Sequence, residues 1–317
     1  MLRITNLCEF TNLYYWLLYI RKFVFYSLSH SMNYYCYAQG KVLRKNEIKV
    51  GITDLVMLRG YGAFDFMRTY NGAPFRINDY LSRFENSARE MKLKLPIARM
   101  EFISIINSLL KKNRINTKAH SRVRGDVGIR LLLTGGYSLD SYLPSVKPNL
   151  FILIEDLPQY PEWWSEKGIK LITHEHGREM PRVKTINYLI AIHLADVRRK
   201  HKAQDTLYYY QGKILETTRN NFFLFHGNTL VTADDSVLNG ITRKLVLELA
   251  KKKFKVEVRK VLKSELNKCT ECFITGTTRG ITPVVQIDSK KIGKGKVGEN
   301  TEVLMKLVQR AIVSECK

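Results

Sequence analysis

Cysteine and proline are scarce in this sequence of 317 residues. Its five cysteines, Cys8, Cys36, Cys269, Cys272 and Cys316, are too few and too scattered for a fold held together by disulfides. We therefore expect a reducing compartment, the cytoplasm. The 8 prolines and 19 glycines are an ordinary content for a globular protein, which excludes collagen-like and low-complexity chains.

The sequence also lacks an unbroken apolar run that could cross a membrane. A spanning helix needs about 20 apolar residues, whereas the candidate stretch, residues 13–28, contains Arg21 and Lys22 in its middle. A secretory signal places positive charge ahead of an unbroken apolar stretch, and here only Arg3 precedes it. We expect no membrane association. We interpret residues 1–31 as an extension outside the fold, which begins at Met32.

Acidic side chains are few, because 29 Asp and Glu stand against 52 Lys and Arg and leave a formal net charge of +23. A nucleic-acid-binding protein would show such a balance. However, the densest basic runs, residues 198–202 and 251–255, end helix-like apolar patterns, where cations interact favourably with the helix dipole. No recognised nucleic-acid motif accompanies them. We expect no nucleic-acid partner, and a noncatalytic basic nucleic-acid-binding protein remains a distant alternative.

The length and the 45% hydrophobic content suit about two domains of roughly 150 residues each. We expect a small N-terminal domain over residues 32–156, a linker over residues 157–162, and a larger domain over residues 163–317. In the small domain, Asn71-Gly72 predicts a hairpin turn, and Asn78 or Asp79 is expected to cap the helix that follows.

The larger domain combines a strand, a loop and one long helix over residues 187–200 with a meander of short strands over residues 207–232. Another helix is predicted over residues 242–252. Hairpins of this kind favour an α/β or α+β fold and exclude a doubly wound parallel sheet.

Three motifs suggest chemistry that their context does not support. The glycine pattern of residues 293–298 fits a dinucleotide fingerprint, but too little chain follows it to supply the acid that binds the ribose. Cys269 and Cys272 have the spacing of half a zinc site, yet no second pair exists, so we expect buried, unreactive thiols. His174 and His176 have no evident third ligand. We expect no metal site.

Six other segments occur in an order that is highly specific when they are taken together. They are Leu58-Arg59-Gly60-Tyr61-Gly62-Ala63-Phe64-Asp65, Tyr80-Leu81-Ser82-Arg83-Phe84, Val183-Lys184-Thr185-Ile186-Asn187-Tyr188, Glu216 with Asn221-Phe222-Phe223, Leu238-Asn239-Gly240-Ile241-Thr242-Arg243, and Thr275-Gly276-Thr277. On these segments the chain from about residue 33 to 310 resembles the class IV (fold type IV) pyridoxal-phosphate aminotransferases. That family includes branched-chain aminotransferase, D-amino-acid aminotransferase and aminodeoxychorismate lyase.

The resemblance implies a two-domain enzyme that binds pyridoxal 5′-phosphate (PLP) and forms at least a homodimer. The smaller N-terminal domain would be α/β, and the larger C-terminal domain would carry an antiparallel barrel-like sheet. The resemblance also implies that Lys184 forms the Schiff base with the cofactor and then moves a proton on the substrate. Glu216 would pair with the pyridine nitrogen and keep it protonated. Burial beside a cation would lower the pKa of such a lysine and leave its amine free to attack an aldehyde.

The expected phosphate site has a physical basis as well. Gly240, Ile241 and Thr242 precede or begin a predicted helix, whose free backbone N–H groups attract anions. By resemblance, Arg83 and Thr277 would complete this phosphate site and Tyr188 would hydrogen-bond the hydroxyl of the cofactor ring. Leu238 belongs to the same cofactor-binding segment.

The substrate pocket departs from the two best-known patterns of the family. Gly128-Ile129-Arg130 keeps the arginine of the branched-chain enzymes without their tyrosine, and Thr134-Gly135-Gly136 stands where the common D-amino-acid enzymes carry Arg-x-His. Thr278 and Arg279 replace small residues of the family. We expect Arg130 and Arg59, the latter reaching across the dimer interface, to hold the substrate carboxylate. Phe64 and Thr278 would complete the substrate site.

These features favour a transaminase that moves the amino group between an amino acid and a 2-oxo acid such as 2-oxoglutarate. The pattern favours D-amino acids such as D-alanine or D-glutamate slightly over branched-chain L-amino acids. An aminodeoxychorismate lyase, which releases pyruvate from its aromatic substrate, stays open as an alternative, because it would use the same cofactor and lysine.

Overall fold

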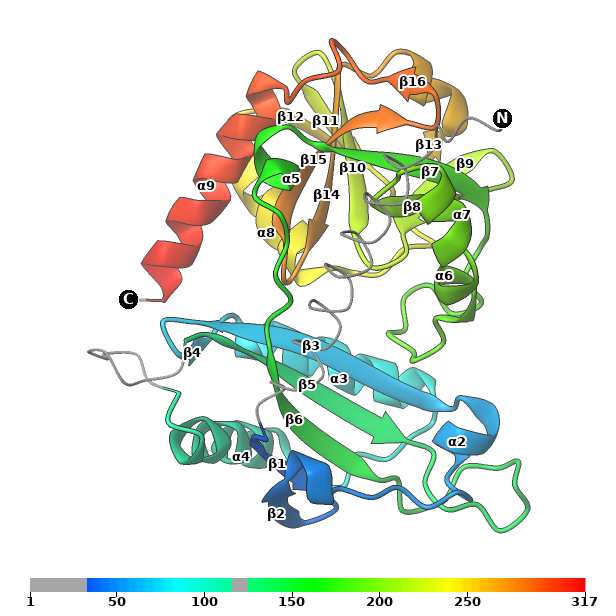
Figure 1. Cartoon of the computed structure of the whole chain (residues 1–317), viewed down its shortest axis with the longest axis vertical. Helices are drawn as coiled ribbons and strands as arrows, with labels where there is room; N and C mark the ends of the chain where they lie inside the picture. Colours follow the sequence, from blue (N-terminus) through cyan, green and yellow to red (C-terminus); the bar gives the residue numbers. More distant parts are fainter. Residues whose placement is uncertain (1–32, 116–124, 317) are drawn as a thin grey trace, which may run out of the picture.

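The computed structural model describes residues 33–115 and 125–316, which form two sheets with helices packed around each (Figure 1). The expected extension over residues 1–31, the expected start of the fold at Met32, and Cys8 all lie outside the described residues. No helix in the described ranges is both long enough and apolar enough to span a membrane.

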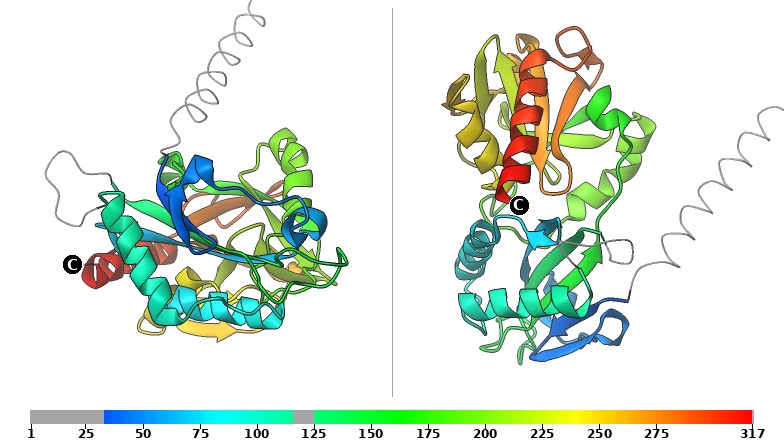
Figure 2. Two further views of the ribbon diagram at one scale, coloured as in Figure 1. Left: turned by 90° about the horizontal axis from the view of Figure 1, so that it is seen from below. Right: turned by 90° about the vertical axis from the view of Figure 1, so that its left-hand side faces the viewer.

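The first sheet has six strands in the order β2-β1-β6-β5-β3-β4, and all of its pairings are antiparallel. Its strands are β1 (Tyr35–Ala38), β2 (Lys41–Arg44), β3 (Gly62–Tyr70), β4 (Ala73–Pro74), β5 (Val127–Thr134) and β6 (Leu150–Asp156). The helices of this part are α2 (Leu55–Arg59), α3 (Ile77–Glu90) and α4 (Arg99–Lys112). Helices α3 and α4 lie on one side of the sheet (Figure 2), where they enclose an apolar core.

Local sequence signals explain the ends of these elements in part. Asn71 and Gly72 both have positive φ, 51° and 76°, so the predicted hairpin turn between β3 and β4 is confirmed. The predicted cap of α3 is wrong, because the helix begins at Ile77 and follows Arg76, which adopts a left-handed conformation without a side-chain cap. Asp79 lies in the first turn instead, where its carboxylate accepts a hydrogen bond from Lys244 Nζ at 2.7 Å.

The first sheet presents two different faces because side chains alternate along its strands. Buried residues of β3 and β5 face α3 and α4, and the residues between them are only partly buried. Phe66 of β3 lies opposite Arg130 of β5, and Phe64 lies opposite Leu132. All four side chains line a cavity on the face away from the helices.

The second sheet contains a closed ring. Its strands are β7 (Ile169–Glu175), β8 (Asp205–Tyr210), β9 (Lys213–Thr217), β10 (Asn221–His226), β11 (Thr229–Thr232), β12 (Lys255–Val258), β13 (Val261–Leu262), β14 (Glu271–Gly276), β15 (Gly280–Ile287) and β16 (Lys290–Lys291). Strands β10, β14, β15, β7, β8 and β9 follow one another, and the pairing of Glu216 with Asn221 joins β9 back to β10. The predicted barrel-like sheet is therefore confirmed.

The ring is mixed and not wholly antiparallel as expected. The pairings β15–β7 and β7–β8 are parallel. A parallel pair needs a long crossover connection, and the chain between β7 and β8 supplies one that contains α6 (Leu189–His193) and α7 (Ala195–Lys200). The single helix predicted over residues 187–200 is thus two short helices that meet at Leu194, whose side chain is buried against the sheet.

Two further helices, α8 (Ile241–Ala250) and α9 (Glu299–Glu315), cover the outside of the second sheet (Figures 1 and 2). Their apolar side chains pack on the outward residues of β10 and β14, among them Phe223, Phe225 and Phe273. In the sequence, residues 157–162 connect the last strand of the first sheet, β6, to the short helix α5 (Trp163–Glu166), which precedes β7.

The loop that follows β7 docks on the first sheet. Phe64 donates its backbone N–H to the carbonyl of Lys184 at 2.9 Å, and Ile186 donates to the carbonyl of Gly62 at 3.1 Å. The backbone N–H of Lys184 also donates to Ser87 Oγ of α3 at 3.1 Å. These bonds fix residues 184–186, from the loop after β7, to the edge of β3 as a short added strand would be.

The aromatic stack under α8 predicts a measurable stability loss. The Phe223 ring is fully buried and lies on the Phe273 ring, with centroids 4.9 Å apart and an angle of 8° between the planes. Phe223→Ala should lower the free energy of unfolding by about 3–5 kcal/mol, because it removes apolar contacts and leaves a cavity. Denaturant unfolding followed by circular dichroism would measure this. Phe223→Leu, which keeps most of the volume, should lose much less, and equal losses for both variants would contradict the packing argument.

Candidate active site

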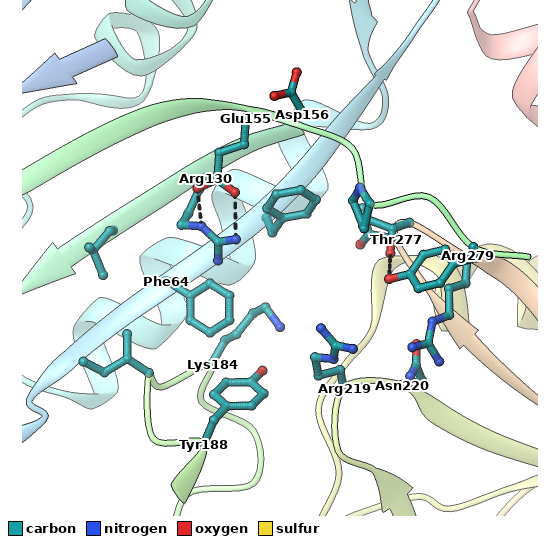
Figure 3. A pocket seen from close by; sticks show the side chains of 16 residues that line it. Phe64, Arg130, Glu155, Asp156, Lys184, Tyr188, Arg219, Asn220, Thr277 and Arg279 are labelled. Atoms are coloured by element: carbon teal, nitrogen blue, oxygen red, sulfur yellow. Dashed lines mark hydrogen bonds and ion pairs between the residues drawn. The ribbon is translucent and has the colours of Figure 1, made fainter. Parts of the chain in front are cut away.

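Two cavities meet between the sheets, and Figure 3 shows side chains that line the larger of them. The larger one, about 630 Å³, is lined by the open face of the first sheet and by turns of the second. The smaller one, about 40 Å³, is lined by the start of α8 and the ends of β9 and β14. Lys184, Tyr188, Arg219 and Thr277 line both cavities, so they stand at the junction.

Lys184 brings an amine to this junction. Its backbone is fixed to β3 and α3, and its Nζ lies 4.6 Å from the centre of the Phe64 ring. Burial of the amine lowers the pKa of Lys184 to about 7, and the nearby Arg83 guanidinium acts in the same direction. A substantial fraction of the amine is therefore neutral near pH 7, as a nucleophilic lysine requires.

Glu216 is a buried carboxylate at the end of β9. Its Oε1 accepts a hydrogen bond from Arg178 Nη1 at 2.8 Å, and its Oε2 accepts from Asn221 Nδ2 at 3.1 Å and from the Leu238 N–H at 3.2 Å. Burial raises the pKa of Glu216, whereas Arg178 and these hydrogen bonds oppose the rise. The carboxylate is thus held in one orientation toward the smaller cavity.

The start of α8 forms an anion-binding end of the smaller cavity. Ile241 and Thr242 line it in the first turn, where backbone N–H groups have no partner within the helix. A Cβ at Gly240 would lie 2.1 Å from Asn221 Oδ1, so only glycine allows this close approach. Thr275 Oγ1 is buried in the same cavity without a hydrogen-bond partner among the described residues.

Arg83 and Thr277 complete this end of the cavity from two other elements. The Arg83 guanidinium is paired with the fully buried Asp65, with Nε–Oδ2 and Nη2–Oδ1 distances of 2.8 and 2.6 Å. Its Nη1 donates to the Asn239 carbonyl at 3.2 Å. The Thr277 hydroxyl lies 2.9 Å from the Tyr80 hydroxyl.

All the residues expected at a cofactor site lie around one space. The smaller cavity is lined, among others, by Arg83, Lys184, Tyr188, Glu216, Leu238, Ile241, Thr242 and Thr277. The Tyr188 ring also contacts Phe64 edge to face, with centroids 5.9 Å apart, and burial raises the pKa of its hydroxyl. An aldehyde-bearing aromatic phosphate fits this set of donors, because an amine, an orienting carboxylate and an anion-binding helix end face the same space.

The expected substrate residues are only partly assembled in this chain. Phe64, Arg130 and Thr278 line the larger cavity. Arg59 does not, because it is exposed at the end of α2, where its Nη1 donates to the neighbouring Leu58 carbonyl. Arg130 is not free either, since Glu155 accepts from its Nε and Nη2 at 2.8 and 2.9 Å (Figure 3).

Three residues that hold the site together, Arg178, Asp65 and Asn221, were not predicted from the sequence to have a role in it. Arg178 links Glu216 to the loop of Lys184, because its Nη2 donates to the Val183 carbonyl. Asp65 orients Arg83, and Asn221 links Glu216 to the Leu238 carbonyl. Asp65 and Asn221 do belong to the quoted segments, whereas Arg178 lies in an irregular loop without any motif.

The motifs set aside in the sequence stay outside both cavities. Cys269 and Cys272 are buried free thiols with their Sγ atoms 3.4 Å apart, as expected. His176 contacts Tyr208 edge to face, and burial lowers its pKa. Within residues 33–115 and 125–316, no group of three or more His, Cys, Asp or Glu side chains is arranged to hold a metal ion.

Comparison with known proteins agrees with this geometry. The family model for amino-transferase class IV matches residues 62–287. A Methanocaldococcus jannaschii protein named "Putative branched-chain-amino-acid aminotransferase" is 30% identical over 84% of this chain and 93% of its own length. The D-alanine aminotransferase of Bacillus licheniformis is 28% identical over 87% of this chain and 96% of its own length.

A solved structure shares the fold. The branched-chain amino acid aminotransferase of Escherichia coli superimposes with a TM-score of 0.81 at 22% identity, covering 90% of this chain and 97% of that one. The family match spans most of the chain, so this protein belongs to the class IV aminotransferase family. It is a transaminase of that class, which sets aside the noncatalytic alternative.

The low pKa of Lys184 can be measured directly. Trace acetylation with acetic anhydride, without added cofactor, should label Lys184 with a pH midpoint of about 7, since only the neutral amine reacts. The exposed Lys251 at the end of α8 serves as the control for labelling of an amine that solvent reaches. Peptide mapping by mass spectrometry separates the two sites. A midpoint at about 10 for Lys184 would show that its amine is not buried as described.

Proposed function

We propose that this chain is a PLP-dependent transaminase that moves an amino group between an amino acid and a 2-oxo acid such as 2-oxoglutarate. The observation that carries the proposal is that Lys184, Glu216 and the start of α8 line one small cavity. Bound PLP supplies an aldehyde and an electron-withdrawing ring that stabilises the electron pair released at the substrate Cα.

The donors around the smaller cavity suit each part of that cofactor. The N–H groups of Ile241 and Thr242, with the hydroxyls of Thr242 and Thr277 and the guanidinium of Arg83, would hold the phosphate. Glu216, kept in place by Arg178 and Asn221, would hold the ring nitrogen. Tyr188 would donate its hydroxyl to the ring oxygen, and Leu238 would pack beside the ring.

Lys184 carries both the binding and the proton-transfer roles. With PLP bound, its neutral Nζ would hold the aldehyde group of the cofactor, and when free the same amine would accept the proton from the substrate Cα and hold it for return. The surrounding protein keeps the pKa of this amine at about 7, so the same atom can accept and donate a proton near neutral pH. The Phe64 ring packs against the amine, and the Tyr188 ring packs edge to face on Phe64.

The larger cavity would hold the substrate beside Lys184. Arg130 would contact a substrate carboxylate, Phe64 and Thr278 would contact its remaining atoms, and Arg59 would reach the site from a second copy of the chain. The relatives carry both D-alanine and branched-chain names, and we favour D-amino acids such as D-alanine or D-glutamate on the substrate-pocket pattern of Arg59 and Arg130.

We further propose a homodimer and a cytoplasmic location. Exposed apolar side chains gather around α2 and the loop after β5, among them Ile52, Met57, Leu139, Leu143 and Val146. Such a surface suits a protein interface, and Arg59 lies beside it at the end of α2. The four described cysteines are free thiols, which suits a reducing compartment.

Loss of the lysine should abolish both cofactor attachment and turnover. Borohydride reduction of the PLP-loaded protein should add the cofactor mass to the peptide containing Lys184, and Lys184→Ala should show no such adduct. Its turnover should fall by at least about 10²-fold, since it lacks the proton-transfer group. Lys251→Ala is the matched control on an exposed site. Unchanged turnover in Lys184→Ala would refute the assignment.

The same preparation tests the substrate. The absorbance of the loaded wild type should shift with D-alanine or D-glutamate and return on addition of a 2-oxo acid, while L-leucine should act more slowly. A response to L-leucine alone would replace the D-amino-acid preference by the branched-chain one. Pyruvate release from aminodeoxychorismate without any amino acceptor would instead indicate the lyase.

Arg130 should affect the substrate and leave the cofactor unchanged. Arg130→Ala should raise KM for 2-oxoglutarate by about tenfold or more, because a charged hydrogen bond is lost and Glu155 is left facing the anion. The cofactor absorbance should stay as in the wild type. Glu155→Gln releases Arg130 from its ion pair and should lower KM. An unchanged KM in both variants would remove Arg130 from the carboxylate site.

A further inference from the structure

The wall of the larger cavity contributed by the second sheet carries two guanidinium groups. Among the described residues, one has no carboxylate within ion-pair distance and the other has a long ion pair. Arg219 lies in the turn between β9 and β10, and Arg279 lies in the turn between β14 and β15. Arg130 stands on β5 of the first sheet, on the other side of Lys184 (Figure 3). The cavity thus has cationic side chains on both walls.

Arg279 is buried and held rigidly. Its side chain is 5% exposed, and its guanidinium carbon lies 4.6 Å from the Tyr160 ring centre and 4.8 Å from the Trp164 ring centre. Its charged contact, to Asp205 Oδ2, is long at 3.5 Å. A paired guanidinium and carboxylate normally approach to about 2.7–2.9 Å. The group is fixed in place, yet its charge is not closely paired.

Asp205 is already satisfied by other donors. Its Oδ2 accepts hydrogen bonds from Thr217 Oγ1 at 3.1 Å and from Asn220 Nδ2 at 2.9 Å. Its Oδ1 accepts from Thr218 Oγ1 at 2.6 Å and from the Thr206 N–H at 2.8 Å. With these bonds in place Asp205 contacts Arg279 through Nη1, so other N–H groups of the Arg279 guanidinium keep donor capacity for another anion.

Arg219 is the more accessible of the two. Its side chain is exposed, it lines both cavities, and within the described residues no carboxylate lies within ion-pair distance of it. The pKa of the Tyr160 hydroxyl is affected by the charges of both arginines. Burial alone would raise the pKa of Tyr160, but the Thr278 hydrogen bond and the charges of Arg279 and Arg219 lower it. Both guanidinium groups therefore act on the same part of the cavity.

Among the described residues, neither acid that lines the cavity forms an ion pair with Arg219 or Arg279. Glu155 is committed to Arg130, and Asp156 accepts a hydrogen bond from Tyr34 at 2.6 Å. A substrate carboxylate held by Arg130 would leave the charge of Arg219 on the other wall without a carboxylate partner in the described part of the chain. The second wall therefore has a chemistry of its own to contribute to substrate choice.

We propose that Arg219 and Arg279 form a second carboxylate subsite, which selects amino acids and 2-oxo acids that carry two carboxylates. This proposal deepens the transaminase function above and rests on it for the identity of the substrate. Arg279 provides the fixed contact and Arg219 the accessible one, while Thr278 and Asn220 line the same wall with neutral donors. Their roles are in substrate specificity, separate from the proton transfer at Lys184.

Binding of an unreactive pair of ligands tests the subsite without turnover. Calorimetry on the full PLP-loaded chain should show that glutarate binds at least about tenfold more tightly than butyrate, since one more charged contact forms. Arg219→Gln and Arg279→Gln should each reduce that ratio severalfold, and Arg279→Lys should keep part of it. Arg199→Gln is the matched control, because Arg199 is an exposed arginine that pairs with Asp196 within α7 and lines neither cavity. It should leave the ratio unchanged.

The variants separate the subsite from the fold and from the function. Because Arg279 is buried, its variants are compared by near-ultraviolet circular dichroism, whereas Arg219 is exposed and its replacement should not disturb packing. If Arg219→Gln and a folded Arg279→Gln bind glutarate and butyrate with the wild-type ratio, the subsite is refuted while transamination stands. If the ratio falls as expected but no amino group moves between substrates, the transaminase proposal fails while the anion subsite stands.

Discussion

The site depends on one short backbone pairing between the two halves of the chain. The carbonyl of Lys184 and the N–H of Ile186 bond to Phe64 and Gly62, so the loop after β7 is attached to the edge of β3. This attachment closes the gap between the sheets over the Lys184 amine, and burial is the main cause of its low pKa. The reactivity of the lysine therefore comes from the way in which two separate sheets are joined.

Buried charges around that amine are arranged in pairs. Asp65 fixes Arg83, and Arg178 fixes Glu216 while it also bonds to the Val183 carbonyl beside Lys184. Each pair offsets the cost of burying its members. Arg83 of the first pair and both members of the second line the smaller cavity. In the larger cavity, Arg130 is likewise paired with a carboxylate, that of Glu155, whereas Arg219 on the opposite wall has no such partner among the described residues. This difference distinguishes the two walls.

Much of this arrangement could be predicted from the sequence, because it is encoded locally. Asn71-Gly72 encodes a turn, and the segments around Lys184, Glu216 and Thr242 identify the family. Long-range features could not be read in the same way. The direction of β7 relative to β15 leaves no local signal, since either direction suits the same apolar pattern. The pairing of Arg130 with Glu155 depends on strand register, and Arg178 lies in a loop without periodicity.

Closure of the barrel and formation of the site are coupled during folding. Glu216 and Asn221 are the residues that pair β9 with β10, so the seam of the ring and the carboxylate of the site are the same structure. A shift of one residue in the register of β9 against β10 would turn Glu216 away from the cavity. The same shift would break the pairing that closes the ring. The chain cannot complete its barrel and leave its site unformed. A ligand that contacts Glu216, Lys184 and the start of α8 would bind the folded state and not the unfolded chain, and it would therefore stabilise the closed barrel.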